Sequence, residues 1–164
     1  MKSSATELMK NLNGVEEEIR LIHNEDLEES SVLLNSETGN PLYVSKYDFM
    51  ANRQKINELR AEERKIKALL AKFNYETKVI GYDFNINEGL VRLGQLKDNI
   101  KVLLTLSRKS EVFSSGRTYD GSQQLNKVCY SIEEARKVLK ETQKELSALQ
   151  VAIDRTNLTS VIEY

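Results

Sequence analysis

Apolar residues recur at alternating steps of three and four along four stretches of this 164-residue chain. This spacing places them on one stripe of an α-helix, of the kind that is buried between partner helices. The chain has one proline, so little interrupts these stretches. The pattern therefore predicts an all-α fold of four long helices. The four stripes are Leu8, Leu12, Val15, Ile19 and Ile22; Phe49, Asn52, Ile56, Leu59, Glu63, Ile66, Leu70 and Phe73; Leu90, Leu93, Leu96, Ile100 and Leu103; and Ile132, Ala135, Leu139, Thr142, Leu146, Leu149, Ile153 and Thr156.

A capping signature precedes each stripe. Ser4, Ser45, Asn85 and Ser131 are each followed three positions later by an acidic residue. The short polar side chain can accept from free backbone N–H groups of the first turn, and the acid can reach back to the cap. These signatures predict where the helices begin, and they place the second helix at about residues 46–73.

The chain carries a short internal repeat. Thr77–Tyr82 reads TKVIGY, and Thr159–Tyr164 reads TSVIEY, each after a long amphipathic stretch. We interpret this as a duplicated unit, with halves 1–82 and 83–164 in a single domain. The predicted fold is an elongated, antiparallel, coiled-coil-like bundle of two duplicated helical hairpins, related by an approximate two-fold axis.

The connectors have strand-like composition. Residues 32–34 and 42–44 flank a polar loop and predict a β-hairpin. Residues 111–113 and 125–130 flank a Gly/Ser-rich loop, which reads as a looser hairpin or a mobile loop over 114–124. The final tail is expected to pair with another strand, because open strand edges favour aggregation.

Few residues suit catalysis or metal binding. His23 is the only histidine and Cys129 the only cysteine, and no glycine-rich phosphate loop is present. Cys129 lies in an apolar stretch, so we predict a small buried side chain rather than a reactive thiol. We predict no enzyme activity, no catalytic residue, no metal site and no cofactor.

Two polar residues interrupt the second stripe. Asn52 is predicted to fix register or oligomeric state, as single polar seam residues do in coiled coils. Glu63 is expected to pair with a cation across the helix interface or to mark a break in the seam. A buried catalytic acid is the weaker alternative.

Charges flanking the stripes predict how helices pair. Arg53, Arg60 and Lys67 follow one edge of the second helix, and three acids follow the first helix. Opposite signs would meet in an antiparallel hairpin. Arg60 and Arg64 repel each other at i, i+4, so we expect their partners on another helix or another molecule. The acids are Glu16, Glu18 and Glu25.

Two groups of residues are candidates for contact with other molecules. The cations of the second helix could contact nucleic acid, but neighbouring acids interrupt them, which favours a solvated face. Tyrosines gather near helix ends, where they either fasten connectors to the bundle or form a protein interface. The candidate interaction residues are Arg53, Arg60, Arg64, Lys67, Tyr43, Tyr47, Tyr82 and Tyr164.

Composition restricts the setting. The formal net charge is −1, which gives no global attraction to nucleic acid or anionic membranes. No apolar run approaches the ~20 residues that span a bilayer, and the N-terminus lacks the apolar core of a signal peptide. A single cysteine suits a reducing compartment. We therefore expect a cytoplasmic protein without a membrane partner.

The helix ends resemble those of a known family. The second helix closes with Ala71-Lys-Phe73-Asn74-x-x-Thr77, a Leu-rich third helix follows, and the fourth helix closes over 149–159. This order resembles the small bacterial and phage-associated helical proteins often labelled septicolysin. That family more typically has a tryptophan where Leu158 stands here. The label implies a haemolysin, but the resemblance supplies no catalytic residue, and this sequence has no membrane-active segment.

These observations favour a non-enzymatic structural or protein-interaction module. We expect it to self-associate and to contact an unidentified protein, through helix-in-groove contacts or by strand addition. The alternative is a nucleic-acid-associated protein that uses the cations of the second helix.

Overall fold

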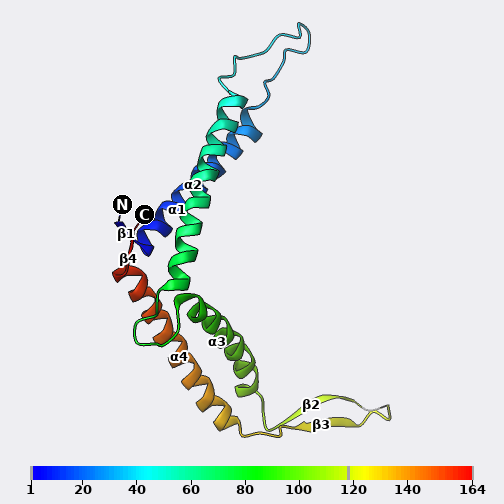
Figure 1. Cartoon of the computed structure of the whole chain (residues 1–164). Coiled ribbons are helices and arrows are strands. Elements are labelled where there is room, and N and C mark those ends of the chain that lie inside the picture. Colours follow the sequence, from blue (N-terminus) through cyan, green and yellow to red (C-terminus); the bar gives the residue numbers. More distant parts are fainter. Residues whose placement is uncertain (1, 118, 164) are drawn as a thin grey trace. The chain divides into compact units, whose positions relative to one another are not determined.

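The computed structural model describes residues 2–117 and 119–163 and is mainly helical (Figure 1). This confirms the prediction of a helical fold with short β elements at the connectors. The elements of the described chain are β1 (Lys2–Ser4), α1 (Ala5–Glu29), α2 (Phe49–Glu76), α3 (Ile86–Ser107), β2 (Val112–Arg117), β3 (Gln123–Lys127), α4 (Ile132–Thr159) and β4 (Val161–Glu163).

Contacts divide the described residues into two compact units. Unit 1 comprises residues 2–76 and 157–163, and unit 2 comprises residues 77–156. Unit 1 thus includes α1, α2 and the tail that follows α4, and unit 2 includes α3, most of α4 and the tail that follows α2. The sequence-based halves 1–82 and 83–164 remain a prediction.

Three of the four predicted helix caps are present. In α1, the Glu7 N–H donates to Ser4 Oγ at 3.2 Å, and Glu7 Oε2 accepts from the Ser4 N–H at 2.8 Å. In α3, Asn85 and Glu88 form the same reciprocal pair, with both bonds at 2.9 Å. Ser131 Oγ accepts from the Glu134 N–H at 3.2 Å. Each cap contributes about 1 kcal/mol to helix stability.

The predicted start of α2 is wrong by three residues. Asp48 Oδ1 accepts from the Ala51 N–H at 3.0 Å, so Asp48 rather than Ser45 caps the helix. Ser45 Oγ instead accepts from the Tyr47 N–H at 3.0 Å. Because Asp48 is also a good cap, the helix starts at Phe49 and runs to Glu76.

In unit 1, α1 and α2 lie side by side and antiparallel (Figure 1). Their apolar stripes supply most of the core. At the ends of the chain, β4 pairs antiparallel with β1, with Val161 opposite Ser4. Ile162 of β4 is buried, so the tail contributes to the core of this unit. The buried core residues of α1 and α2 are Ala5, Leu8, Val15, Ile19, Ile22, Ile56, Leu59, Ile66 and Phe73.

In unit 2, the segment after α2 folds back on the start of α3. Lys78 pairs with Asn85 in an antiparallel bridge, and the Val79 N–H donates to the Phe84 carbonyl at 3.0 Å. The next amide, of Ile80, donates to Thr156 Oγ1 of α4 at 3.0 Å. This segment therefore joins α3 and α4. The most deeply buried apolar side chains of this unit are Val79, Ile86, Leu96, Leu149 and Ile153.

The predicted stripes are buried or half-buried, apart from Phe49 and Leu90. Phe49 is the first residue of α2 and lies where the hairpin ends. Leu90 faces solvent because Gly89 takes the inward position. A Cβ on Gly89 would lie 3.1 Å from Ile153 Cδ1 and 3.3 Å from Val79 Cγ2, so this position is tightly packed.

The connector between α1 and α2 turns back on itself without forming full strands. Leu34 pairs with Pro41 in an isolated antiparallel bridge, and the Leu42 N–H donates to the Leu33 carbonyl at 2.8 Å. Asn35 Oδ1 accepts from two backbone N–H groups of the turn, at 2.9 Å each. The predicted hairpin is reduced to this bridge because the polar turn is long.

The connector between α3 and α4 forms the β2–β3 hairpin, which reaches into the segment 114–124. The ladder is antiparallel and carries an irregularity between Ser114 and Gly116. Cys129 follows β3 and is exposed, so the prediction of a buried residue is wrong. The strand ends at Lys127, before the apolar stretch that suggested burial.

Candidate interaction surface

Asp26 of α1 joins the two helices of unit 1 near the connector. Asp26 Oδ1 accepts from the Tyr47 hydroxyl at 2.7 Å and from Asn52 Nδ2 at 3.2 Å. Its other oxygen forms an ion pair with Arg53, whose guanidinium lies 5.2 Å from the centre of the Phe49 ring. Asp26 thus holds one side chain from the end of the connector, Tyr47, and two from the start of α2, Asn52 and Arg53. These bonds hold the C-terminal end of the connector and the first turn of α2 against α1.

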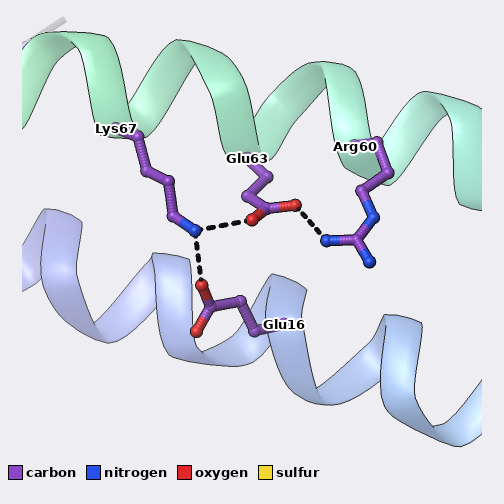
Figure 2. Close-up of polar contacts among 4 residues, drawn as sticks. All are labelled: Glu16, Arg60, Glu63 and Lys67. Atoms are coloured by element: carbon purple, nitrogen blue, oxygen red, sulfur yellow. Dashed lines mark hydrogen bonds and ion pairs between the residues drawn. The ribbon is translucent and has the colours of Figure 1, made fainter.

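A second polar cluster lies midway along the same hairpin (Figure 2). Glu63, only 8% exposed, accepts from Arg60 Nη1 at 2.7 Å and from Lys67 Nζ at 2.6 Å. Lys67 Nζ also lies 2.9 Å from Glu16 Oε1 on α1. The expectation that Glu63 and Arg60 pair across the helix interface is therefore wrong. Their bonds stay within α2, and only Lys67 reaches α1.

These contacts determine the charge state of the cluster. Hydrogen bonds from Lys67 and then Arg60 lower the pKa of Glu63 below its ordinary value. Hydrogen bonds to Glu63 and then Glu16 raise the pKa of Lys67. Both groups are therefore held in their charged forms at neutral pH. A carboxylate that is ionised at neutral pH is poorly suited to donate a proton as a general acid.

Three of the four candidate cations of α2 are paired with neighbouring acids. Arg53, Arg60 and Lys67 form the ion pairs just described, and Lys55 Nζ lies 2.5 Å from Glu18 Oε1. Of the four predicted cations, Arg64 alone has no ion pair within the described residues. The positive charge open to a phosphate backbone is therefore smaller than the sequence suggested.

The connector of unit 1 exposes five apolar side chains, of which Tyr43 alone was among the candidate interaction residues. We call its five residues the apolar connector. Val44 is 92% exposed and Leu33 is 67% exposed; Leu34 belongs to the bridge, and the other four lie between the bridge and the ends of the helices. The signal was present in the two short apolar runs, 32–34 and 42–44, which were interpreted as the strands of a β-hairpin. The apolar connector comprises Leu33, Leu34, Leu42, Tyr43 and Val44.

The candidate tyrosines do not form one cluster. Tyr43 is exposed, and its hydroxyl donates to the Ser31 carbonyl at 3.4 Å. Tyr47 is half-buried on Asp26. Tyr82 belongs to unit 2, where its ring lies 4.9 Å from that of Phe84. Tyr164 lies outside the described residues. Tyr43 and Tyr47 are therefore the two that the structure brings to one connector.

A groove runs beside α2 in unit 1. Its lining includes the apolar residues Leu8, Ile66 and Leu69 and the cations Lys65 and Lys72. A lining of apolar and charged side chains suits an amphipathic segment, as in helix-in-groove recognition. Asn11, Glu62 and Ala68 complete the lining.

The described residues contain no group of three or more His, Cys, Asp or Glu side chains that could hold a metal ion. None of their helices is both long and apolar enough to cross a bilayer.

The comparisons with known proteins bear on the fold alone. No family model matches the chain, and no curated protein matches it. Its fold is similar to that of a solved protein from Corynebacterium diphtheriae, described as a functionally unknown conserved protein. The TM-score is 0.71 at 15% sequence identity, and the match covers 99% of this chain and 100% of that one. The two chains therefore share an overall fold.

Proposed function

We propose that this chain is a non-enzymatic structural module that binds a protein partner and associates with itself. The apolar connector carries this proposal. Contiguous exposed apolar side chains on a polar helical protein are typical of interaction sites. Leucine, valine and tyrosine side chains gain free energy when a partner excludes water from them.

The connector is also held in place, which favours binding. Asp26 fixes Tyr47 at one end, and Ser45 Oγ donates to the Glu29 carbonyl at 3.4 Å. Asn35 orders the turn between the two apolar runs. A surface that is ordered before binding loses less conformational entropy on association. The α1–α2 hairpin thus presents the apolar connector on a fixed support.

Internal duplication is part of this proposal. Helices α2 and α4 each contain 28 residues and follow a capping side chain, Asp48 and Ser131. The tail of each of these helices pairs with the residue that caps α3 or α1, as Lys78 does with Asn85 and Val161 with Ser4. Similar tails in similar places support a repeated unit.

The two tails differ in register by one residue. The repeat aligns Val79 with Val161, but the buried residues are Val79 and Ile162. A shift of one residue turns the other face of a strand inward. Insertion or loss of one residue between helix and tail would account for this difference between two related units.

The nucleic-acid alternative is less well supported. Arg53, Arg60 and Lys67 are engaged in ion pairs, and the cations that remain near Arg64 are Lys65 and Lys72, which line the groove. Binding through these cations would weaken steeply with salt. Fluorescence anisotropy with labelled DNA and RNA at low and moderate salt tests it. A salt-sensitive signal that Arg64→Ala reduces would favour the alternative.

We place the proposed assembly in the cytoplasm, because the exposed thiol of Cys129 suits a reducing compartment. This assignment also accords with the expected bacterial or phage-associated origin. Cell fractionation followed by detection of the tagged chain tests it, and recovery outside the cytoplasm would contradict it.

Partner binding is tested by comparing variants purified from the native host. The triple change Leu33→Ser, Leu42→Ser and Val44→Ser removes apolar area from the apolar connector. Leu21→Ser, at an exposed leucine of α1 outside the connector, is the matched control. We expect a stoichiometric protein to be retained by the wild type and the control and lost from the triple variant. Equal retention by all three would refute the role of the connector.

A further inference from the structure

The β2–β3 hairpin of unit 2 is a two-stranded sheet with little cover. Every residue of β3 is exposed, and Phe113 is the single half-buried residue of β2. In the described part of the chain no third strand pairs with either edge. Two-stranded sheets without packing are marginally stable in water, and a third strand strengthens them. The hairpin therefore has a physical reason to accept another strand.

The backbone geometry shows which groups face the open edge of β3. The Val128 N–H donates to the Glu111 carbonyl at 2.9 Å, so residue 128 points its polar groups toward β2. Successive residues of an antiparallel strand alternate in this direction. Gln123, Leu125 and Lys127 therefore point their N–H and C=O groups away from β2. These groups form a regular row of donors and acceptors.

The outer edge of β3 is better suited to pairing than that of β2. β2 carries an irregularity between Ser114 and Gly116, and such bulges disturb edge pairing. β3, with the sequence QQLNK, has no proline, and its one charge is at its last residue. Natural sheets protect their edges with prolines, bulges and central charges, and β3 has none of these.

We propose that β3 pairs antiparallel with β3 of a second copy of this chain, giving a four-stranded sheet. The two-fold axis would pass beside Leu125, so that Leu125 faces Leu125 of the second copy. Gln123 would then face Lys127 of the second copy. No like charges meet, and the 60% exposed Leu125 gains an apolar neighbour. The same patch serves both copies, as an isologous interface requires.

This inference rests on the self-association part of the proposed function and specifies where it occurs. The partner strand is assigned to a second copy of this chain, because the open edge of β3 is complementary to itself in charge, length and hydrogen-bonding pattern. The apolar connector belongs to unit 1 and β3 to unit 2, so the two surfaces can be altered separately.

Disulfide trapping tests the predicted register. In a Cys129→Ala background of the full chain, Leu125→Cys places two thiols opposite each other. Cα atoms of hydrogen-bonded antiparallel pairs lie about 5.5 Å apart, which a disulfide can span. Gln124→Cys is the control, because residue 124 would face Asn126 of the second copy. We expect a covalent dimer from Leu125→Cys and at least about tenfold slower trapping from Gln124→Cys.

Sedimentation velocity over a concentration series provides a second, non-covalent test. Leu125→Lys would bring two ammonium groups together at the axis and weaken dimerisation about tenfold or more. Ser114→Lys places the same charge on the same hairpin, directly opposite Leu125 but away from the β3 edge. It should leave the dimer unchanged.

The outcomes separate this inference from the proposed partner binding. Trapping at residue 125 together with loss of the dimer in Leu125→Lys supports the inference. Equal trapping at 124 and 125, or an unchanged dimer in Leu125→Lys, overturns it. A wild type that stays monomeric at about 100 μM overturns it together with the self-association part of the proposal. Partner retention through the apolar connector would be unaffected by that result.

Discussion

Thr156 is the residue whose substitution has the most specific expected effect. It is 1% exposed, and its Oγ1 accepts from the Ile80 N–H at 3.0 Å while donating to the Ala152 carbonyl at 2.7 Å. Thr156→Val keeps the shape of the side chain but removes the acceptor. The Ile80 amide would then lack its partner beside a core in which Val79 and Ile153 are buried.

The size of the effect follows from the chemistry of that bond. Leaving a buried N–H unsatisfied costs about 1–3 kcal/mol. Ile80 is itself partly exposed, so water can replace part of the bond, and we expect about 1–2 kcal/mol. For a chain of this size that corresponds to a fall in Tm of roughly 2–8 °C.

Two measurements and one control test this reasoning. Thermal unfolding gives the stability change, and amide hydrogen exchange measured by NMR reports directly on the Ile80 N–H. Thr142→Val is the matched control, because Thr142 Oγ1 donates to the Val138 carbonyl of its own helix at 2.8 Å, as Thr156 does to Ala152, but accepts no tail amide within the described residues. If Ile80 exchange is unchanged in Thr156→Val, or if Thr142→Val is equally destabilising, the assigned role of Thr156 is refuted.

Three further results are expected, each measured by chemical denaturation. Asp26→Ala should lower the free energy of unfolding by about 1–3 kcal/mol, because it removes the acceptor of several side chains, and no loss would contradict that role. The pKa of Glu63 is lowered on folding, so its stabilisation is present above the unfolded pKa and is lost as pH falls through the folded one. Glu63→Gln should therefore lose less stability than the wild type when the pH is lowered. The control Glu62→Gln should lose as much stability as the wild type. Gly94→Ala should raise the free energy of unfolding by up to about 1 kcal/mol, because its Cβ meets open space. Gly89→Ala should raise it less or lower it, because its Cβ would press on Ile153. Equal increases in the two variants would refute the packing argument.

The features that could be predicted from the sequence, the four helices and three of their caps, depend on residues close together in the chain. Apolar spacing located the four helices, and the caps at Ser4, Asn85 and Ser131 depend on residues three positions apart. Competition between neighbours explains one error, since Ser45 and Asp48 can both cap and the structure uses the second. The exposure of Leu90 depends on Gly89 packing against Ile153 of another helix, which spacing cannot reveal.

The candidate site was less predictable because it depends on tertiary contacts. The sequence suggested that Arg60 and Glu63 would find partners on other helices, but i, i+3 and i, i+4 contacts within α2 satisfy them first. The apolar connector looks like strands in sequence, since short apolar runs between turn residues are ambiguous. Only its exposed surface in the structure identifies it as a candidate for binding.

The pairing of β4 with β1 has a consequence for how the chain is made. Unit 2 is one continuous stretch of sequence, whereas unit 1 needs residues 157–163 to complete it. During synthesis the α1–α2 hairpin would emerge first, but β1 could not pair until β4 had left the ribosome. Closing that long loop last would make the N-terminal hairpin the slower unit to mature. Until then its open end would be the part of the nascent chain most exposed to chaperones and proteases.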